Sequence, residues 1–166
     1  MVASTNRGLE MDKKEIKKLT REILKEMKDE KKRENLHNTR LLLENYNILK
    51  SNIEDVKGDI TPILNKIEEL EMEKDKIFIK SMVKTKMRTA KMLAYVDEAK
   101  KIIEEELKNK KEYYKFRAFE MFYFEEKDNE KICKELNCGK NSPKSWRDEI
   151  INKMNVLLWG VEAFGI

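Results

Sequence analysis

Residues 128–159 read DNEKICKELNCGKNSPKSWRDEIINKMNVLLW, and this stretch decides the fold prediction. Asp128 is suited to cap a short helix, and Gly139 is expected to take the left-handed conformation in the turn that follows it. Ser142 and Pro143 then suit the N-cap and the first position of a second helix. That helix repeats apolar residues at steps of four, four and three: Trp146, Ile150, Met154 and Leu157. The stretch therefore predicts two helices joined by a turn.

The second helix begins among polar and basic side chains that suit contact with DNA. They are Lys140, Asn141, Lys144, Ser145 and Arg147. In a helix-turn-helix, the start of the second helix presents such side chains to base edges and phosphates. Asp148 and Glu149 count against a strongly phosphate-binding face, and many helical hairpins share this pattern. These residues alone leave DNA contact and simple packing both open.

An aromatic-rich segment, YYKFRAFEMFYF at residues 113–124, precedes the two helices and holds seven of the chain's thirteen aromatic residues. Aromatic side chains at this density could stack on nucleic-acid bases. They occupy nearly all sides of a helix, however, and a helix that is apolar all round is typical of a core. We therefore favour a buried core helix over a base-stacking surface.

Further upstream, residues 42–70 carry apolar residues at alternating steps of four and three, which is typical of coiled-coil-like packing. The members of this seam are Leu42, Tyr46, Leu49, Ile53, Val56, Ile60, Ile63, Ile67 and Leu70. Gly58 is suited to stop a helix and Pro62 to begin one, so the seam is interrupted between them. The break is either a kink or a tight corner. We prefer a corner at which the two halves of the seam face each other as a hairpin.

A second apolar stripe follows, in a stretch without glycine or proline between Pro62 and Cys138. Its members are Phe78, Met82, Thr85, Thr89, Met92, Val96, Ala99 and Ile103. Lys84, Lys86 and Arg88 form a weaker second patch for DNA or a partner, with an ordinary solvated helix face as the alternative. Residues 108–112 are the expected connector to the C-terminal part.

The N-terminal segment is expected to be a tail followed by a basic helix. Between Lys13 and Arg33 there are ten basic and five acidic residues, and the apolar residues form one narrow stripe. They are Ile16, Leu19, Ile23, Leu24 and Met27. Residues 28–35 then lack apolar side chains, as in a solvated stalk or a hinge. We therefore divide the chain into a basic tail and helix (1–34), a helical hairpin or coiled-coil section (35–109) and a helix-turn-helix domain (110–166).

Composition supports an all-α fold. The chain has 166 residues, with 36 Lys and Arg against 32 Asp and Glu, and only five glycines and two prolines. With so few residues that favour turns, the composition argues against many short strands and predicts long helices. Without a secretory signal or an apolar run of about 20 residues, we expect no membrane contact, and two cysteines fit a reduced cytoplasmic protein.

No group of residues suits catalysis or metal binding. Cys133 and Cys138 lie five positions apart without the further ligands that zinc needs, and we expect both to pack as small apolar residues. The single histidine, His37, has no nucleophile in a motif around it, and there is no phosphate-binding glycine loop. We therefore expect a protein that is not an enzyme and uses no cofactor or metal.

Residues 122–160 resemble the C-terminal helix-turn-helix of phage-encoded late transcription regulators of the ArpU and RinA type, which are similar to region four of bacterial sigma factors. The matching residues are Ile132-Cys133, Leu136-Asn137, Trp146 and the ending Val156-Leu157-Leu158-Trp159-Gly160. Asn45-Tyr46, Leu49-Lys50 and the block at residues 88–99 also look like this family. Gly139 and Pro143 depart from its pattern, which implies a longer turn and a later start of the second helix.

The resemblance implies a phage or prophage transcription regulator that works in the bacterial cytoplasm. It favours an activator and leaves repression open as the alternative. The regulator would read promoter DNA through Lys140, Asn141, Lys144, Ser145 and Arg147, with Trp146 holding the second helix on the core. RNA polymerase would be a partner, and the heptad-like section would form a homodimer or bind another helix.

Two other interpretations stay open. The modest net charge of +4 and the regular seam at residues 42–70 also fit a helical adaptor or coiled-coil oligomerisation protein that does not bind DNA. A divergent sigma factor that melts promoters itself is less well supported, because no upstream segment resembles the aromatic melting region of such factors.

Overall fold

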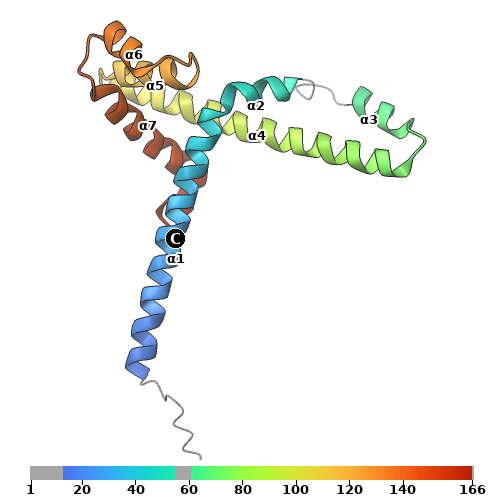
Figure 1. Ribbon diagram of the computed structural model, residues 1–166, viewed down its shortest axis with the longest axis horizontal. Coiled ribbons are helices and arrows are strands. Elements are labelled where there is room, and N and C mark those ends of the chain that lie inside the picture. Colours follow the sequence, from blue (N-terminus) through green and yellow to red (C-terminus); the bar gives the residue numbers. More distant parts are fainter. Residues whose placement is uncertain (1–12, 55–60, 166) are drawn as a thin grey trace, which may run out of the picture.

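The computed structural model describes residues 13–54 and 61–165, and every regular element in them is helical. The all-α prediction is confirmed. The helices are α1 (Lys13–Glu44), α2 (Tyr46–Asn52), α3 (Thr61–Glu68), α4 (Glu73–Asn109), α5 (Tyr113–Tyr123), α6 (Asn129–Leu136), α7 (Ser142–Trp159) and the short 3₁₀ helix η2 (Gly160–Phe164). Figure 1 shows α1 as a stalk, α2 to α4 as an arm that points away from it, and α5 to α7 gathered at the other side. No helix in the described part of the chain has the length and apolar character needed to cross a membrane.

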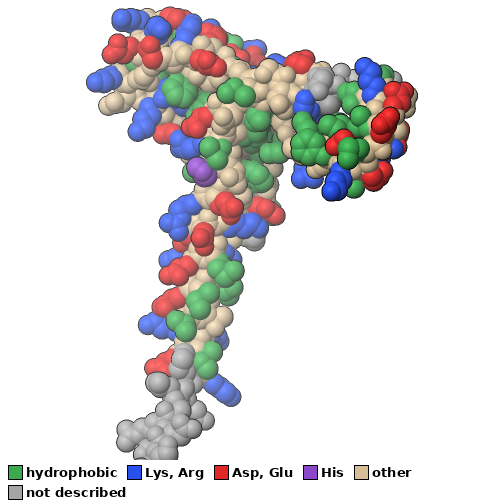
Figure 2. All heavy atoms as spheres, turned by 45° about the vertical axis from the view of Figure 1, so that its right-hand side comes forward, with side chains coloured by type: hydrophobic (Ala, Val, Ile, Leu, Met, Phe, Trp, Pro, Cys, Tyr) green, Lys and Arg blue, Asp and Glu red, His purple; other side chains and the backbone are tan. Residues whose placement is uncertain are grey.

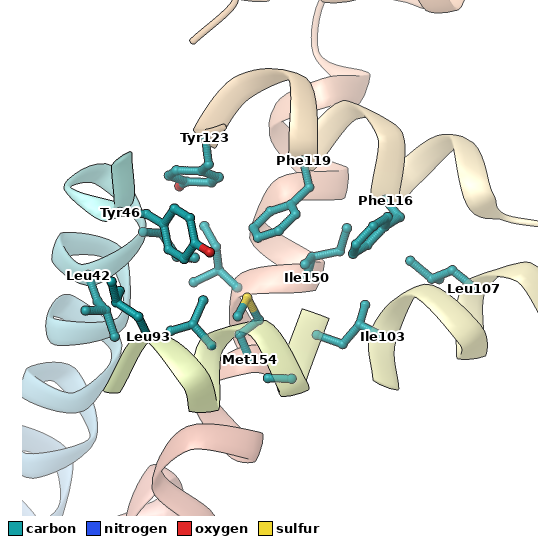
Figure 3. Packing of buried hydrophobic residues seen from close by; sticks show 14 of the residues in the cluster. Leu42, Tyr46, Leu93, Ile103, Leu107, Phe116, Phe119, Tyr123, Ile150 and Met154 are labelled. Carbon is teal, nitrogen blue, oxygen red and sulfur yellow. The ribbon is translucent and has the colours of Figure 1, made fainter. Parts of the chain in front are cut away.

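The main core lies where the stalk, the arm and the C-terminal helices meet. It combines buried residues from five helices, and Figure 3 shows most of them converging between α4, α5 and α7. The largest fully buried members are Leu43, Ile53, Val96, Ile103, Leu107, Phe116, Phe119, Ile150, Ile151 and Met154. The aromatic segment is therefore mainly a core helix, as predicted, since α5 contributes Phe116, Phe119 and Tyr123 to this cluster.

This core crosses the expected segment boundaries. Leu43 of α1 and Ile103 of α4 pack in the same cluster as Phe119 and Ile150, so the C-terminal helices share their core with residues before position 110. The boundary at 34/35 falls inside α1, which continues as one helix from Lys13 to Glu44. Residues 28–35 are thus part of a stalk and not a hinge.

The arm is a helical hairpin, but its two sides are not the two halves of the seam at residues 42–70, which is the pairing that we prefer from the sequence. α2 and α3 each pack against α4 and make no comparable contact with each other. The chain turns back at residues 69–72, after α3, and α4 is the returning helix (Figure 1). The preferred pairing of the two halves of the seam is therefore wrong for the described residues, because α2 and α3 both pack against α4 instead. Gly58, where we placed the corner, lies outside the described residues.

The stripe of α4 is buried in only part of its length. Val96, Ala99 and Ile103 lie in the core, whereas Phe78 is 65% exposed near the far end of the arm. The connector at residues 108–112 is confirmed: α4 ends at Asn109 and α5 begins at Tyr113. In the absence of a glycine, Lys111 takes the left-handed conformation (φ 61°) that reverses the chain there.

Buried hydrogen bonds fix the crossing of α1 and α7. The Thr39 hydroxyl lies 3.1 Å from Asn155 Oδ1 and 3.0 Å from the Asn35 carbonyl oxygen, and it accepts a hydrogen bond from Trp159 Nε1 at 2.9 Å. Thr39 is fully buried and Asn155 nearly so. Because buried polar groups are expensive to leave without a partner, this arrangement favours one register between the two helices.

η2 extends this contact along α1. Asn35 Nδ2 donates to the Glu162 carbonyl oxygen at 3.0 Å, and Lys31 forms an ion pair with the Glu162 side chain. Gly165 adopts a positive φ of 74°, and a Cβ at this position would lie 2.3 Å from the Lys28 carbonyl oxygen. The C-terminal segment therefore lies directly against α1 from Lys28 onward.

Replacing Thr39 with Ala tests the contact between α1 and α7. The change removes the partner of Asn155 and Trp159, and we expect the free energy of unfolding to fall by about 1–3 kcal/mol in urea titrations. Thr85→Ala is the matched control, because Thr85 is an exposed threonine on α4 whose hydroxyl bonds only its own helix. An equal effect of both substitutions would contradict this role of Thr39.

Candidate nucleic-acid interface

α6 begins with the cap that the sequence predicts. The Asp128 carboxylate accepts a hydrogen bond from the backbone N–H of Lys131 at 2.8 Å. This bond stabilises the charged carboxylate, so it lowers the pKa of Asp128 below its ordinary value. Ile132, one turn into α6, is fully buried against Ala118 and Met121 of α5. The cap and this apolar contact together set the position of α6 on α5.

The turn after α6 differs from the prediction in its left-handed residue. Asn137 adopts φ 48° and ψ 54°, while Gly139 has no positive φ, so the expected role of Gly139 is wrong. The helix ends one residue before Asn137, and asparagine tolerates this conformation better than most residues. Five residues, 137–141, separate α6 from α7, and Asn141 rather than Ser142 is the N-cap, without a side-chain hydrogen bond.

α7 is anchored to the other helices along its inner face. Trp146 packs on the small cluster around Ile132 and meets Tyr114 edge-on, with ring centroids 4.9 Å apart. Further along α7, Ile150 and Met154 enter the main core (Figure 3). The anchoring expected of Trp146 is therefore observed, and the first two turns of α7 are held in place from one side.

Four of the five predicted contact residues are exposed around the start of α7. They are Lys140, Asn141, Lys144 and Ser145, and we call this group the α7 entry surface. Within the described chain, neither Lys140 nor Lys144 has an ion-pair partner. Two ammonium groups and a side-chain amide are thus free to bind an external acceptor next to the N-terminus of a helix, where the backbone dipole also favours anions.

Arg147 differs from the other four because its side chain is engaged within the protein. Its guanidinium carbon lies 3.8 Å from the centroid of the Phe122 ring, and Nη1 donates to Asn129 Oδ1 at 3.1 Å. Burial disfavours the charged form and lowers the pKa of Arg147. Asn129 in turn donates from Nδ2 to the Lys140 carbonyl oxygen at 2.8 Å. Arg147 therefore connects α5, α6 and the turn, and it positions Lys140.

The two acidic residues of α7 are compensated by cations from other helices. Asp148 accepts a hydrogen bond from Arg40 of α1 at 3.1 Å. Glu149 forms an ion pair with Lys115 of α5 at 3.0 Å, and Lys153 lies 3.9 Å from its other oxygen. Their charges consequently oppose an anion at the α7 entry surface less than the sequence suggests.

The second predicted patch does not form one surface. Lys84 and Arg88 are exposed and lie one turn apart, but Lys86 lies on another side of α4 and is half-buried. Lys86 lines a groove with Asn52 of α2 and Phe78 of α4. Lys91 and Tyr95, which are both exposed, continue the row of Lys84 and Arg88 at helical spacing. This row lies on the arm, apart from the start of α7 (Figure 1).

The two cysteines lie close together around the end of α6, whereas His37 lies on α1. Both thiols are free and half-buried, and burial raises the pKa of Cys138. His37 is exposed on the stalk, where Figure 2 shows the chain's single histidine in purple. In the residues that the structure describes, no three His, Cys, Asp or Glu side chains are grouped so that they could hold a metal ion.

Sequence reasoning identified the exposed residues but missed the side chains that hold them in place. Asn129, Phe122 and Arg40 belong to no sequence motif, and their roles depend on contacts between different helices.

Comparisons with protein-family models, with curated proteins and with solved structures give no match to this chain. The case for a DNA interface consequently depends on the geometry of this surface and on the resemblance described above.

Two substitutions in the turn are expected to differ in their effect on stability. Asn137→Ala places a less tolerant residue in the left-handed conformation and should lower the free energy of unfolding by about 1 kcal/mol. Gly139→Ala should stay within about 0.5 kcal/mol of wild type, because its Cβ would meet only Ser142 Oγ at 3.6 Å. Chemical denaturation measures both values. A larger loss for Gly139→Ala than for Asn137→Ala would contradict this description of the turn.

Proposed function

We propose that this protein is a DNA-binding transcription regulator that contacts duplex DNA through the α7 entry surface. The observation that carries the proposal is the pair of unpaired lysines, Lys140 and Lys144, at the exposed start of a helix whose other side is anchored by Trp146 and Arg147. A rigid helix start with free cations and amides has the chemistry that the major groove and its phosphates require.

The four exposed side chains would divide the work of recognition. Lys140 and Lys144 neutralise phosphates or bind guanine, and Asn141 has the donor and acceptor pair that suits adenine. Ser145 can donate to a phosphate or a base edge. Arg147 acts as a positioning residue, because its guanidinium already binds Asn129 and stacks on Phe122.

The resemblance to late regulators of the ArpU and RinA type supplies the biological setting of the proposal. It favours a phage or prophage gene activator in the bacterial cytoplasm, with promoter DNA and RNA polymerase as partners and no enzymatic activity. Lys84 and Arg88 on the arm, with Lys91 in the same row, would be a secondary contact with DNA or polymerase.

Charge removal at the α7 entry surface tests the proposal. We expect Lys140→Ala with Lys144→Ala to weaken binding to duplex DNA, measured by fluorescence anisotropy across a salt series. The logarithm of the binding constant falls linearly as the logarithm of the salt concentration rises, and each lost phosphate contact should make this slope shallower by about 0.9. The double variant should therefore show a slope that is shallower by nearly two, while its circular dichroism spectrum stays helical.

The matched control is Lys32→Ala with Lys66→Ala, which removes the same charge from exposed positions on the stalk and on α3. This control should keep the wild-type slope. An equal loss in both double variants would show unspecific attraction to the whole protein, and no binding by the wild type at low salt would reject the proposal.

The second candidate function is a helical adaptor that does not bind DNA. The exposed apolar side chains at the end of the arm favour it, since Phe78 and Met82 lie beside the groove between α2 and α4, and Figure 2 shows hydrophobic side chains gathered at this end of the molecule. Apolar pairing strengthens or stays constant as salt rises, so the same salt series separates the two functions.

A further inference from the structure

The outer half of α1 has an apolar stripe that faces solvent. Five side chains between 47% and 61% exposed form it: Ile16, Leu19, Ile23, Leu24 and Met27. Figure 2 shows hydrophobic side chains along one side of the stalk, interspersed with charged ones. The packed part of α1 begins only near Lys28, where Gly165 lies against it. No core of the described residues lies against this side of α1, and an apolar helix face of this kind is typical of an association surface.

The spacing of the stripe has a symmetry that suits a second copy of the same helix. Ile16, Thr20, Ile23 and Met27 are separated by four, three and four residues, as in the seam of a coiled coil. Running the second helix in the opposite direction places Ile16 against Met27 and Thr20 against Ile23. Both ends of the seam are then paired at once, and Leu19 and Leu24 widen the contact on its two sides.

The charges of α1 favour the same direction. Residues 13–21 carry five basic and one acidic side chain, a net charge of +4, whereas residues 22–30 carry four acidic and two basic ones, a net charge of −2. An antiparallel pair places the positive half of each helix along the negative half of the other. A parallel pair would place +4 beside +4 and −2 beside −2, and this like-charge arrangement opposes association.

We propose that two copies of this chain form an antiparallel dimer through residues 13–30 of α1, with Ile16 of each copy opposite Met27 of the other. The interface has the two-fold symmetry usual for homodimers. It is separate from the α7 entry surface and does not depend on DNA binding. The two sets of C-terminal helices lie at opposite ends of the shared stalk.

The size of the interface predicts a weak dimer. Eighteen residues of helix span about 27 Å at about 1.5 Å per residue. Two helices in contact over this length bury less surface than the roughly 1,200 Å² at which stable interfaces begin. The average mass should therefore rise with concentration from 19.9 kDa towards twice that value.

Sedimentation velocity of the full chain, over about 1–300 µM, tests for the dimer. Ile23→Glu should keep the protein monomeric over this range while helicity by circular dichroism is unchanged, because position 23 is exposed in the monomer. Lys25→Glu is the control on the opposite side of α1 and should dimerise within about threefold of the wild-type dissociation constant. A wild type that stays monomeric, forms larger oligomers, or dimerises equally well with Ile23→Glu would overturn the proposal.

Disulfide cross-linking tests the direction of the two helices, in a Cys133→Ser, Cys138→Ser background that removes both native thiols. Ile16→Cys combined with Met27→Cys should give a covalent dimer under mild oxidation, since the thiol at position 16 of each copy faces the thiol at position 27 of the other. Ile16→Cys alone should stay monomeric on a denaturing gel, because the two equivalent positions are about 16 Å apart along an antiparallel pair. Efficient cross-linking of the single variant would indicate a parallel dimer and reject the proposed arrangement.

Discussion

The packing of α7 against α1, α4 and α5 is the constraint on which the rest of the structure depends. Burial of Ile150, Ile151 and Met154 supplies most of the stabilisation, since each fully buried side chain of this kind contributes about 1.5–3 kcal/mol. The hydrogen bonds of Thr39 with Asn155 and Trp159 contribute less, about 0.5–1.5 kcal/mol each. Apolar burial can tolerate small sliding of one helix on another, whereas these bonds hold only at one crossing of α1 and α7.

The position of α7 also determines what its first turns present to solvent. Trp146 and Arg147 point back to α5 and α6, so Lys144, Ser145 and the turn before them are left on the outside. The bond from Asn129 to the Lys140 carbonyl oxygen holds the turn against α6. A surface that is fixed before it meets a ligand loses less conformational entropy on binding, and such rigidity suits recognition of a regular polymer such as duplex DNA.

The sequence predicts those features that depend on residues close together along the chain. The Asp128 cap, the packing side of Trp146 and the connector before Tyr113 follow from capping chemistry and helical spacing. Contacts between distant segments were not predictable in this way. The seam at residues 42–70 does not reveal whether its two halves pack against each other or against α4. Both segments have apolar residues at the same alternating steps of four and three, and only the structure shows that α4 is the partner.

The same distinction explains the errors at the candidate site. The residue type of Gly139 predicts a left-handed conformation there, but α6 ends so that Asn137 adopts it instead. Arg147 has the sequence character of a DNA contact, and only the nearby Phe122 ring and Asn129 amide show that its side chain is already used. Asp148 and Glu149 likewise oppose anion binding when only the sequence is considered, but in the structure Arg40 and Lys115 from other helices form ion pairs with them.

A titration of the isotopically labelled full chain with a short duplex DNA, followed by amide NMR shifts, tests the central claim most directly. We predict that the largest changes fall on residues 138–146, with smaller ones along Lys84, Arg88 and Lys91, and that Ile23 and Met27 on the stalk are unaffected. Shifts confined to the stalk or the end of the arm, or no shifts at low salt, would contradict a DNA interface at the start of α7.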